Sequence, residues 1–279
     1  MTSAARPRPA TEAPPVRAMS FGGGVQSTAM LVLAAEKRID YALALFCNVG
    51  DDSEHPDTLA YVRDHSQPYA EAHGIDLVTL RKTKRDGSLE TVYSRVNDAN
   101  ESIGIPVRMS SGAPASRHCT IDFKVRLIAK ELKRRGATKD APATVALGIS
   151  IDEYHRMRSE SGIPHEVLDY PLIDARISRK DCLRIVRGAG LPAPPKSSCW
   201  FCPYHTVAAW SQMREDRPDL FAASVAMERR INVKREALGQ NRVFFSSRLK
   251  PLDLAISEPQ PRLFRDDDAA CDIGGYCGV

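Results

Sequence analysis

Four short, mainly apolar segments are spaced along the first half of the chain, at residues 16–20, 41–49, 75–80 and 143–149. Each has the length of a β-strand, and the uninterrupted run at 41–49 is typical of a strand that is covered on both faces. Helical periodicity follows the first two, at 27–37 and at 58–73. Strands that alternate with helices predict an α/β fold, with a parallel sheet flanked by helices.

The second half of the chain predicts mainly helices. The helices are expected at residues 123–136, 179–188, 206–214 and 220–238. Between the third and fourth predicted strands, residues 81–114 are polar and contain the helix-breaking sequence Ile103-Gly104-Ile105-Pro106. We expect an extended insertion or lid there.

Composition restricts the class of protein without naming a substrate. The net charge of +4 favours neither nucleic acid nor a small molecule. No segment approaches the ~20 apolar residues of a membrane helix, and the proline-rich segment 1–16 lacks the apolar core of a signal peptide. We expect that segment to be a disordered tail, and the protein to be cytoplasmic with no membrane partner. Seven cysteines argue against a disulfide framework, so thiols are available for metal binding or chemistry.

Three consecutive glycines lie between the first predicted strand and the first predicted helix. Gly22, Gly23 and Gly24 leave backbone N–H groups unobstructed, and the helix start near Ser27 favours a bound phosphate. The hydroxyls of Ser27 and Thr28 add further donors. Neither the Walker loop nor the dinucleotide glycine pattern fits this spacing. The alternative is a flexible connection without a ligand.

This loop resembles the PP-loop, whose usual form is Ser-Gly-Gly-x-Asp-Ser. Gly23, Gly24 and Ser27 match it. Gly22 replaces the first serine, with Ser20 close by, and Gln26 replaces the aspartate, which bears on magnesium binding. The resemblance implies a PP-loop ATP pyrophosphatase of the adenine nucleotide alpha-hydrolase superfamily, a HUP/Rossmann-type fold that binds ATP with Mg²⁺.

A second segment, residues 48–58, follows the second predicted strand. It resembles the Asp-Thr-Gly-x-x-x-Pro-Glu-Thr segment of the phosphoadenosine phosphosulfate (PAPS) reductase family, with Asn48 in place of the first aspartate. The resemblance implies that Asn48 and Gly50 contact the adenosine. The alternative is that the turn only caps a helix, through Ser53 or Asp57.

A third segment, residues 148–158, follows the fourth predicted strand and resembles the family's Gly-x-Arg-x-x-Glu-Ser segment. The resemblance implies nucleotide contacts by Gly148, Asp152 and Glu153, and phosphate contacts by Arg156 and Arg158. A surface helix start is the alternative for the two acidic residues. Residues 170–174, Tyr-Pro-Leu-Ile-Asp, resemble a later family motif. Together these similarities cover about residues 18–210.

The spacing Cys199-x-x-Cys202 allows two thiolates to bind one metal or cluster. Iron-sulfur adenylylsulfate (APS) reductases resemble this chain there and at Cys119. The resemblance implies a 4Fe-4S cluster held by Cys119, Cys199 and Cys202. Cys277 or Cys271 is then the fourth ligand, unless one iron stays open. Zinc is the alternative metal.

Two further cysteines lie within predicted core elements. For Cys47, in a predicted strand, and Cys182, in a predicted helix, we expect buried thiols without a ligand.

The resemblance implies an ATP-dependent adenylating sulfurtransferase that modifies a nucleic-acid base or a small metabolite. Lys124, Arg156 and Arg158 would neutralise developing charge, and Cys277 would bind the cluster or relay sulfur. A cysteine desulfurase or a thioredoxin is the implied sulfur-handling partner. An APS/PAPS reductase and a non-catalytic nucleotide-binding module with structural zinc are the alternatives.

The predicted organisation follows from these motifs. After the tail at 1–16, a PP-loop α/β domain spans 17–195. A cysteine-rich helical region at 196–279 packs on the same core.

Overall fold

The computed structural model describes residues 15–97 and 103–256. In this part of the chain, five parallel strands form one sheet in the order β3-β2-β1-β5-β6. The strands are β1 (Arg17–Phe21), β2 (Leu43–Asn48), β3 (Asp76–Arg81), β5 (Ala143–Leu147) and β6 (Glu166–Asp169). The chain moves outward from β1 to β3 and then returns to the other side of β1. The predicted parallel α/β fold is confirmed.

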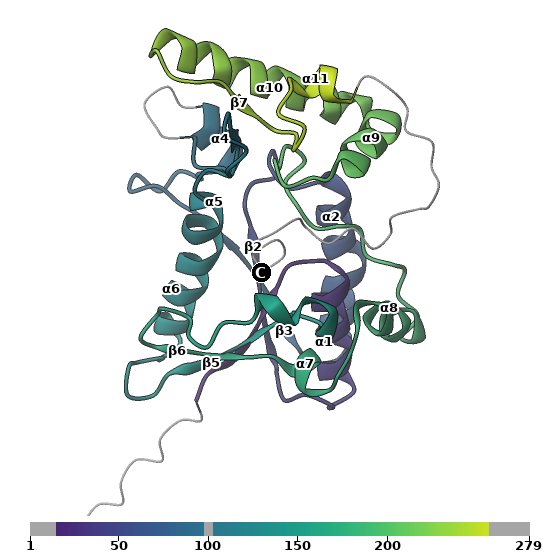
Figure 1. Cartoon of the computed structure of the whole chain (residues 1–279). Helices are drawn as coiled ribbons and strands as arrows, with labels where there is room; N and C mark the ends of the chain where they lie inside the picture. The colour runs from purple at the N-terminus through teal and green to yellow at the C-terminus, as the bar shows by residue number, and fades with distance from the viewer. Residues whose placement is uncertain (1–14, 98–102, 257–279) are drawn as a thin grey trace, which may run out of the picture.

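Helices cover both faces of this sheet (Figure 1). On one face lie α1 (Val25–Ala35), α8 (Arg179–Gly188) and a helix built from α2 (Pro56–Tyr61), the π-helical turn η1 (Val62–Ser66) and α3 (Gln67–Ala72). The opposite face is covered by α6 (Arg126–Arg134), which continues from α5 (His118–Thr120) and the π-helical turn η2 (Ile121–Val125).

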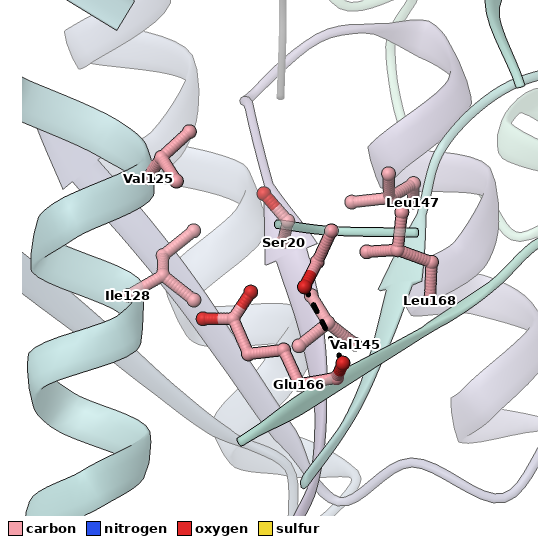
Figure 2. A pocket seen from close by; sticks show the side chains of 8 residues that line it. Ser20, Val125, Ile128, Val145, Leu147, Glu166 and Leu168 are labelled. Atoms are coloured by element: carbon pink, nitrogen blue, oxygen red, sulfur yellow. Dashed lines mark hydrogen bonds between the residues drawn. The ribbon is translucent and has the colours of Figure 1, made fainter. Parts of the chain in front are cut away.

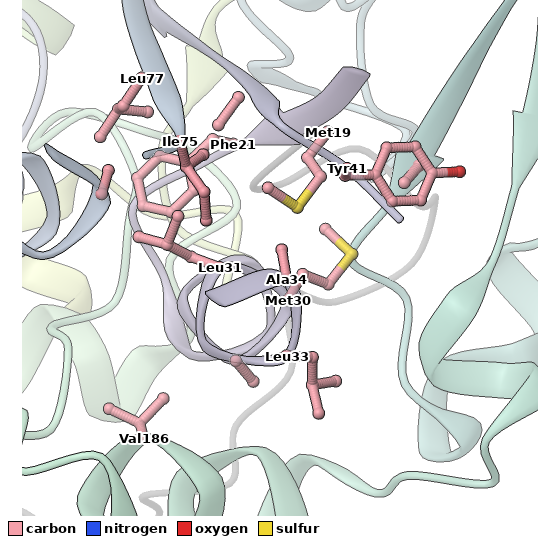
Figure 3. Packing of buried hydrophobic residues seen from close by; sticks show 14 of the residues in the cluster. Met19, Phe21, Met30, Leu31, Leu33, Ala34, Tyr41, Ile75, Leu77 and Val186 are labelled. Atoms are coloured by element: carbon pink, nitrogen blue, oxygen red, sulfur yellow. The ribbon is translucent and has the colours of Figure 1, made fainter. Parts of the chain in front are cut away.

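Side chains of the central strands point alternately to the two faces of the sheet and pack in the hydrophobic cluster on each face. Met19 and Phe21 of β1 point to the side of α1, whereas Ala18 points to the side of α6. Met30 and Leu31 of α1 are fully buried against the first face (Figure 3). Full burial of such a side chain contributes roughly 1.5–3 kcal/mol, so this packing fixes the start of α1 relative to β1.

A third hydrophobic cluster lies outside the sheet. It joins α4 (Val92–Asn97), the cysteine-bearing segment around Trp200, α9 (Val207–Asp216), α10 (Pro218–Ala237) and α11 (Leu252–Ala255). These helices lie together at the top of Figure 1. A short antiparallel pair, β4 (Arg108–Met109) and β7 (Val243–Phe244), completes this part.

The prediction missed several short elements. β6 has only four residues with a partly exposed face, so its sequence lacks a continuous apolar run. The expected insertion at 81–114 contains α4 and β4. Also missed were η3 (Ile151–Arg156) and α7 (Pro171–Asp174). Most of the predicted tail, together with Cys271 and Cys277, lies outside the described residues.

Within the described ranges, no helix is both long enough and apolar enough to cross a membrane.

Candidate nucleotide and cysteine site

The glycine loop lies at the carboxyl end of β1, where the strand order reverses between β1 and β5. Open α/β sheets bind ligands in the crevice at this point. Gly23 has φ +75°, and a Cβ there would lie 3.0 Å from Val62 Cγ2 and 3.1 Å from Thr58 Cγ2. The loop therefore packs directly on α2 and η1, and both the positive φ and these tight contacts favour glycine at this position.

The N-terminus of α1 points out of this loop. Gly24 is the N-cap, and the Ser27 hydroxyl accepts from the Gly24 N–H at 3.1 Å and donates to its carbonyl oxygen at 3.0 Å. The first N–H groups of a helix have no intrahelical acceptor, so this turn presents donors to an anion. Thr28, by contrast, is fully buried, and its hydroxyl has no hydrogen-bond partner in the described structure.

The loop after β5 touches the glycine loop. A Cβ on Gly148 would lie 3.2 Å from the Ser27 amide nitrogen, so this close approach favours glycine. Two of the three predicted nucleotide segments are therefore in contact.

Gln26 links the glycine loop to two charged side chains. Its Nε2 donates to Glu153 Oε2 at 3.1 Å, and its Oε1 accepts from Arg179 Nη1 at 2.8 Å. Glu153 in turn pairs with Arg156 at 2.6 Å, both side chains being 9% exposed. Both Asp152 and Glu153 lie in the first turn of η3, as the alternative expected, but Glu153 is buried and hydrogen-bonded to the glycine loop through Gln26, whereas Asp152 is exposed.

Arg179 is the residue in this network that the sequence reasoning missed. It begins α8, and its backbone N–H donates to the Asp152 carboxylate. Its only sequence signal is a basic residue in the first turn of the helix that follows the Pro-Leu-Ile-Asp motif. Arg158 is placed by its backbone, which exchanges two 2.9 Å hydrogen bonds with the Tyr170 hydroxyl.

The second predicted segment forms a locked turn after β2. Asn48 is buried, donates to Asp51 Oδ1 at 2.7 Å and accepts from the Gly50 N–H at 2.9 Å. Arg81, at the end of β3, holds Asp51 with two 2.9 Å hydrogen bonds and lowers its pKa. The cap of the next helix is His55, whose Nδ1 accepts from Asp57 N–H at 3.3 Å. The alternative of capping by Ser53 or Asp57 was wrong.

The segment before Cys199 runs directly along these loops. The Ser197 hydroxyl donates to the Gly22 carbonyl oxygen, and the His55 N–H donates to the Ser198 carbonyl oxygen at 3.0 Å. Cys199 pairs with Glu54 as an antiparallel β-bridge. The cysteine turn is therefore held by both the glycine loop and the turn after β2.

Trp200 strengthens this attachment. Its backbone N–H donates to the Ser53 carbonyl oxygen at 3.2 Å, and its indole N–H donates to that of Asp52 at 2.8 Å. The Cys202 N–H donates to the Cys199 carbonyl oxygen at 3.1 Å, which closes the tight turn that brings the two cysteines together.

Cys119 lies in α5, the first turn of the helix that covers the other face of the sheet. It packs against the same hydrophobic cluster as Cys199, and its N–H donates to the Gly104 carbonyl oxygen at 2.9 Å. Thiols are the donor type that iron-sulfur centres use, and two of the three predicted ligands, Cys119 and Cys199, therefore pack against one hydrophobic cluster. Among residues 15–97 and 103–256, no three Cys, His, Asp or Glu side chains are gathered closely enough to hold a single metal ion.

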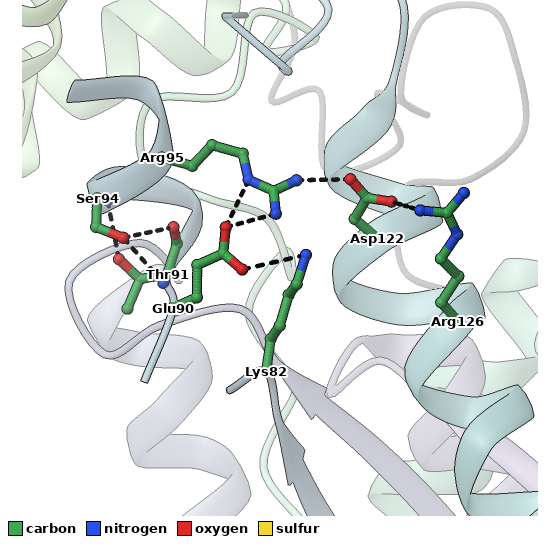
Figure 4. A network of polar contacts seen from close by, with 7 residues as sticks. All are labelled: Lys82, Glu90, Thr91, Ser94, Arg95, Asp122 and Arg126. Carbon is green, nitrogen blue, oxygen red and sulfur yellow. Dashed lines mark hydrogen bonds and ion pairs between the residues drawn. The ribbon is translucent and has the colours of Figure 1, made fainter. Parts of the chain in front are cut away.

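A network of ion pairs joins the segment 81–114 to the helix that contains Cys119. Arg95 of α4 binds Glu90 and, at 2.6 Å, Asp122 of η2 (Figure 4). Lys82 pairs with Glu90 at 3.2 Å. The Lys82 ammonium and the Arg95 guanidinium lie 4.7 and 4.6 Å from the Phe123 ring centroid. These contacts position the helix turn that carries Cys119 and Lys124.

The two remaining cysteines of the described structure are core residues, as predicted. Cys47 is 5% exposed and Cys182 is fully buried. Burial raises the pKa of each thiol to about 12, so neither is a thiolate at neutral pH.

Ser20 lies near the end of β1, two residues before the glycine loop. Its side chain lines a cavity of about 30 Å³ on the α6 side of the sheet, with Glu166 and several aliphatic side chains (Figure 2). Burial raises the pKa of Glu166 to about 7, and its Oε1 has no hydrogen-bond partner within the described residues. The cavity has room for about one water molecule.

No protein-family model and no curated protein matches this chain. Among solved structures, the chain is similar to the U34-tRNA thiolase NcsA from Methanococcus maripaludis, solved with its 4Fe-4S cluster. The sequences are 16% identical, the TM-score is 0.42, and the match covers 78% of this chain and 72% of that chain.

Proposed function

We propose that this protein is an ATP-dependent adenylating sulfurtransferase with an iron-sulfur cluster beside its nucleotide site. One observation carries the proposal: the segment that leads into Cys199 is hydrogen-bonded to the glycine loop at Gly22 and paired with the turn after β2 at Glu54. The loop proposed to bind phosphate and the turn proposed to bind the cluster therefore lie at one edge of the sheet.

The glycine loop and the first turn of α1 would bind the ATP phosphates through backbone N–H groups. Asn48 and Gly50 shape the turn next to which the adenosine would lie. Gln26 stands where the PP-loop has aspartate, so Mg²⁺ would be bound mainly by the phosphates.

The reaction has two steps. An oxygen of the acceptor attacks the α-phosphorus of ATP, and pyrophosphate leaves. A sulfide then displaces the adenylated oxygen, and AMP leaves. Where the sulfur-donor protein delivers a persulfide instead, a second thiol must attack the donor sulfur of the acceptor–S–S–donor bond, which forms a disulfide with the donor and leaves one sulfur on the acceptor. Arg179 would neutralise charge on the phosphates, as would Lys124, Arg156 and Arg158.

Cys119, Cys199 and Cys202 would hold the 4Fe-4S cluster, with Cys277 as the fourth ligand or as a thiol that relays sulfur. Bound there, the cluster would supply an iron site for the incoming sulfur. The carbonyl oxygens of Asp52 and Ser53 anchor Trp200 and thereby fix the cysteine turn.

Anaerobically prepared protein with ATP and candidate acceptors tests the proposal. We expect acceptor-dependent release of pyrophosphate, and an oxygen-to-sulfur exchange in the acceptor by mass spectrometry. Release of sulfite from a sulfonucleotide with reduced thioredoxin would instead assign the chain to the reductases. ATP binding without pyrophosphate release, together with bound zinc, would leave a nucleotide-binding module.

A further inference from the structure

A cavity of about 410 Å³ lies between the C-terminal half of α10 and the segment that precedes Cys119. Its walls are aliphatic, with Ile105 and Val107 on one side and Ile231 of α10 on the other. Leu238, just beyond α10, completes the lining. Volumes of this order hold small organic ligands.

The charged side chains among its described lining residues are all basic. Lys234 Nζ donates to the Asn97 carbonyl oxygen at 2.7 Å, and Arg235 Nε donates to that of Asn241 at 2.6 Å. An ammonium has three N–H donors and a guanidinium has five, so each side chain is held in place and retains donors. A fixed Lys and Arg beside an apolar wall complement an anionic group with an apolar body.

One wall of the cavity is the backbone that holds Cys119. His118 and Gly104 both line the cavity, and the Gly104 carbonyl oxygen accepts from the Cys119 N–H. A ligand in the cavity would therefore lie beside a proposed cluster ligand.

We propose that this cavity binds a small organic anion, with its apolar body between the aliphatic walls and its carboxylate or phosphate on Lys234 and Arg235. We further propose that this anion is the acceptor that receives sulfur, and this part of the proposal rests on the proposed function. The binding itself needs neither ATP nor a cluster.

Titration calorimetry with octanoate and uridine 5′-monophosphate tests this assignment, each anion being compared with its uncharged counterpart, octanamide or uridine. A saturating α,β-methylene ATP analogue blocks the glycine loop throughout. We expect at least one anion to bind about tenfold more tightly than its uncharged counterpart. The preferred anion distinguishes an aliphatic from a heterocyclic body.

Two variants locate the binding. Lys234→Ala with Arg235→Ala should weaken the anion about tenfold or more. Leu238→Glu should do the same by adding a carboxylate at a position that is 71% exposed, where folding is not at stake. Arg229→Ala is the matched control, because Arg229 lies on the same helix but pairs with Asp253 and does not line the cavity.

Equal binding of charged and uncharged probes, an equal loss in Arg229→Ala, or binding only of oligonucleotides would overturn the cavity assignment. Pyrophosphate release is measured separately. A protein that releases pyrophosphate with an acceptor but binds neither anion keeps the proposed function and loses this site. A protein that binds an anion in the cavity but releases no pyrophosphate keeps this binding site and loses the proposed function.

Discussion

The Ser197 hydroxyl donates a hydrogen bond to the carbonyl oxygen of Gly22, across 175 residues of sequence. Both residues are buried. This bond joins the glycine loop to the segment that ends in Cys199, so a displacement of either one is transmitted to the other. It is a direct hydrogen bond between the glycine loop and the segment that leads into the cysteine turn.

Ser197→Ala should loosen that link. Loss of one buried hydrogen bond costs about 1 kcal/mol, which corresponds to about a fivefold weaker affinity for ATP if the loop must be ordered to bind. Ser198→Ala is the control, because the contact of Ser198 with His55 uses its backbone carbonyl and survives. Calorimetry with ATP measures both variants, and equal affinities in the two would contradict the coupling.

Local sequence was sufficient for the elements that lie beneath the site. The strand before Gly22 and the helix after Ser27 are specified by apolar runs and glycines, and α8 has the predicted boundaries. The four residues of β6 were missed because an edge strand with charged residues lacks that pattern. The contact of Arg179 with Gln26 joins distant segments, and the position of Arg179 in the first turn of a helix does not indicate which residue it contacts.

Gly23→Ala should destabilise the fold and abolish ATP binding. Alanine at φ +75° costs about 1–2 kcal/mol, and its Cβ would also meet Val62 and Thr58. Gly239→Ala is the control, since its φ is +64° but nothing lies within 4 Å of the added carbon. Urea unfolding should show Gly23→Ala about 1–3 kcal/mol less stable than Gly239→Ala. Equal losses would show that the packing of the loop on α2 and η1 is unimportant.

Arg179→Ala should weaken ATP binding about tenfold, because the guanidinium both orients Gln26 and adds positive charge at the loop. Lys180→Ala removes a neighbouring exposed charge on the same helix turn and should leave the affinity unchanged. The comparison separates a specific contact from general electrostatic attraction. If both variants weaken ATP binding equally, only general electrostatic attraction is supported.

The stability of the fold should depend on pH through Glu166. Its pKa, raised to about 7 by burial, means that the folded protein holds this proton more tightly than the unfolded chain does. The resulting stabilisation is fully present below about pH 4.5 and is lost as the pH rises through about 7. Because the carboxyl is only partly buried and solvent screens its charge, Glu166→Gln should gain about 1–2 kcal/mol relative to wild type between pH 5 and pH 8.

Urea unfolding at several pH values measures this difference. Glu160→Gln, at an exposed position nearby in sequence, is the control and should follow wild type. A Glu166→Gln difference that stays constant with pH would show that the carboxyl ionises normally in the folded protein.

The cysteine spacing predicted the turn of Cys199 and Cys202 but not the contacts that position Cys119. Cys199 and Cys202 were predicted to share a turn, and they do. The polar network from Lys82 to Asp122, which positions the turn carrying Cys119, depends on residues in an insertion with little periodicity. Its contacts were therefore outside the reach of pattern analysis.

Metal analysis of anaerobically purified protein tests whether an iron-sulfur cluster is bound beside the glycine loop. We expect stoichiometric iron and acid-labile sulfide with visible absorbance, lost in Cys199→Ser but retained in Cys182→Ser, while ATP affinity stays within about twofold of wild type. Stoichiometric zinc without iron in the wild-type protein would contradict this expectation.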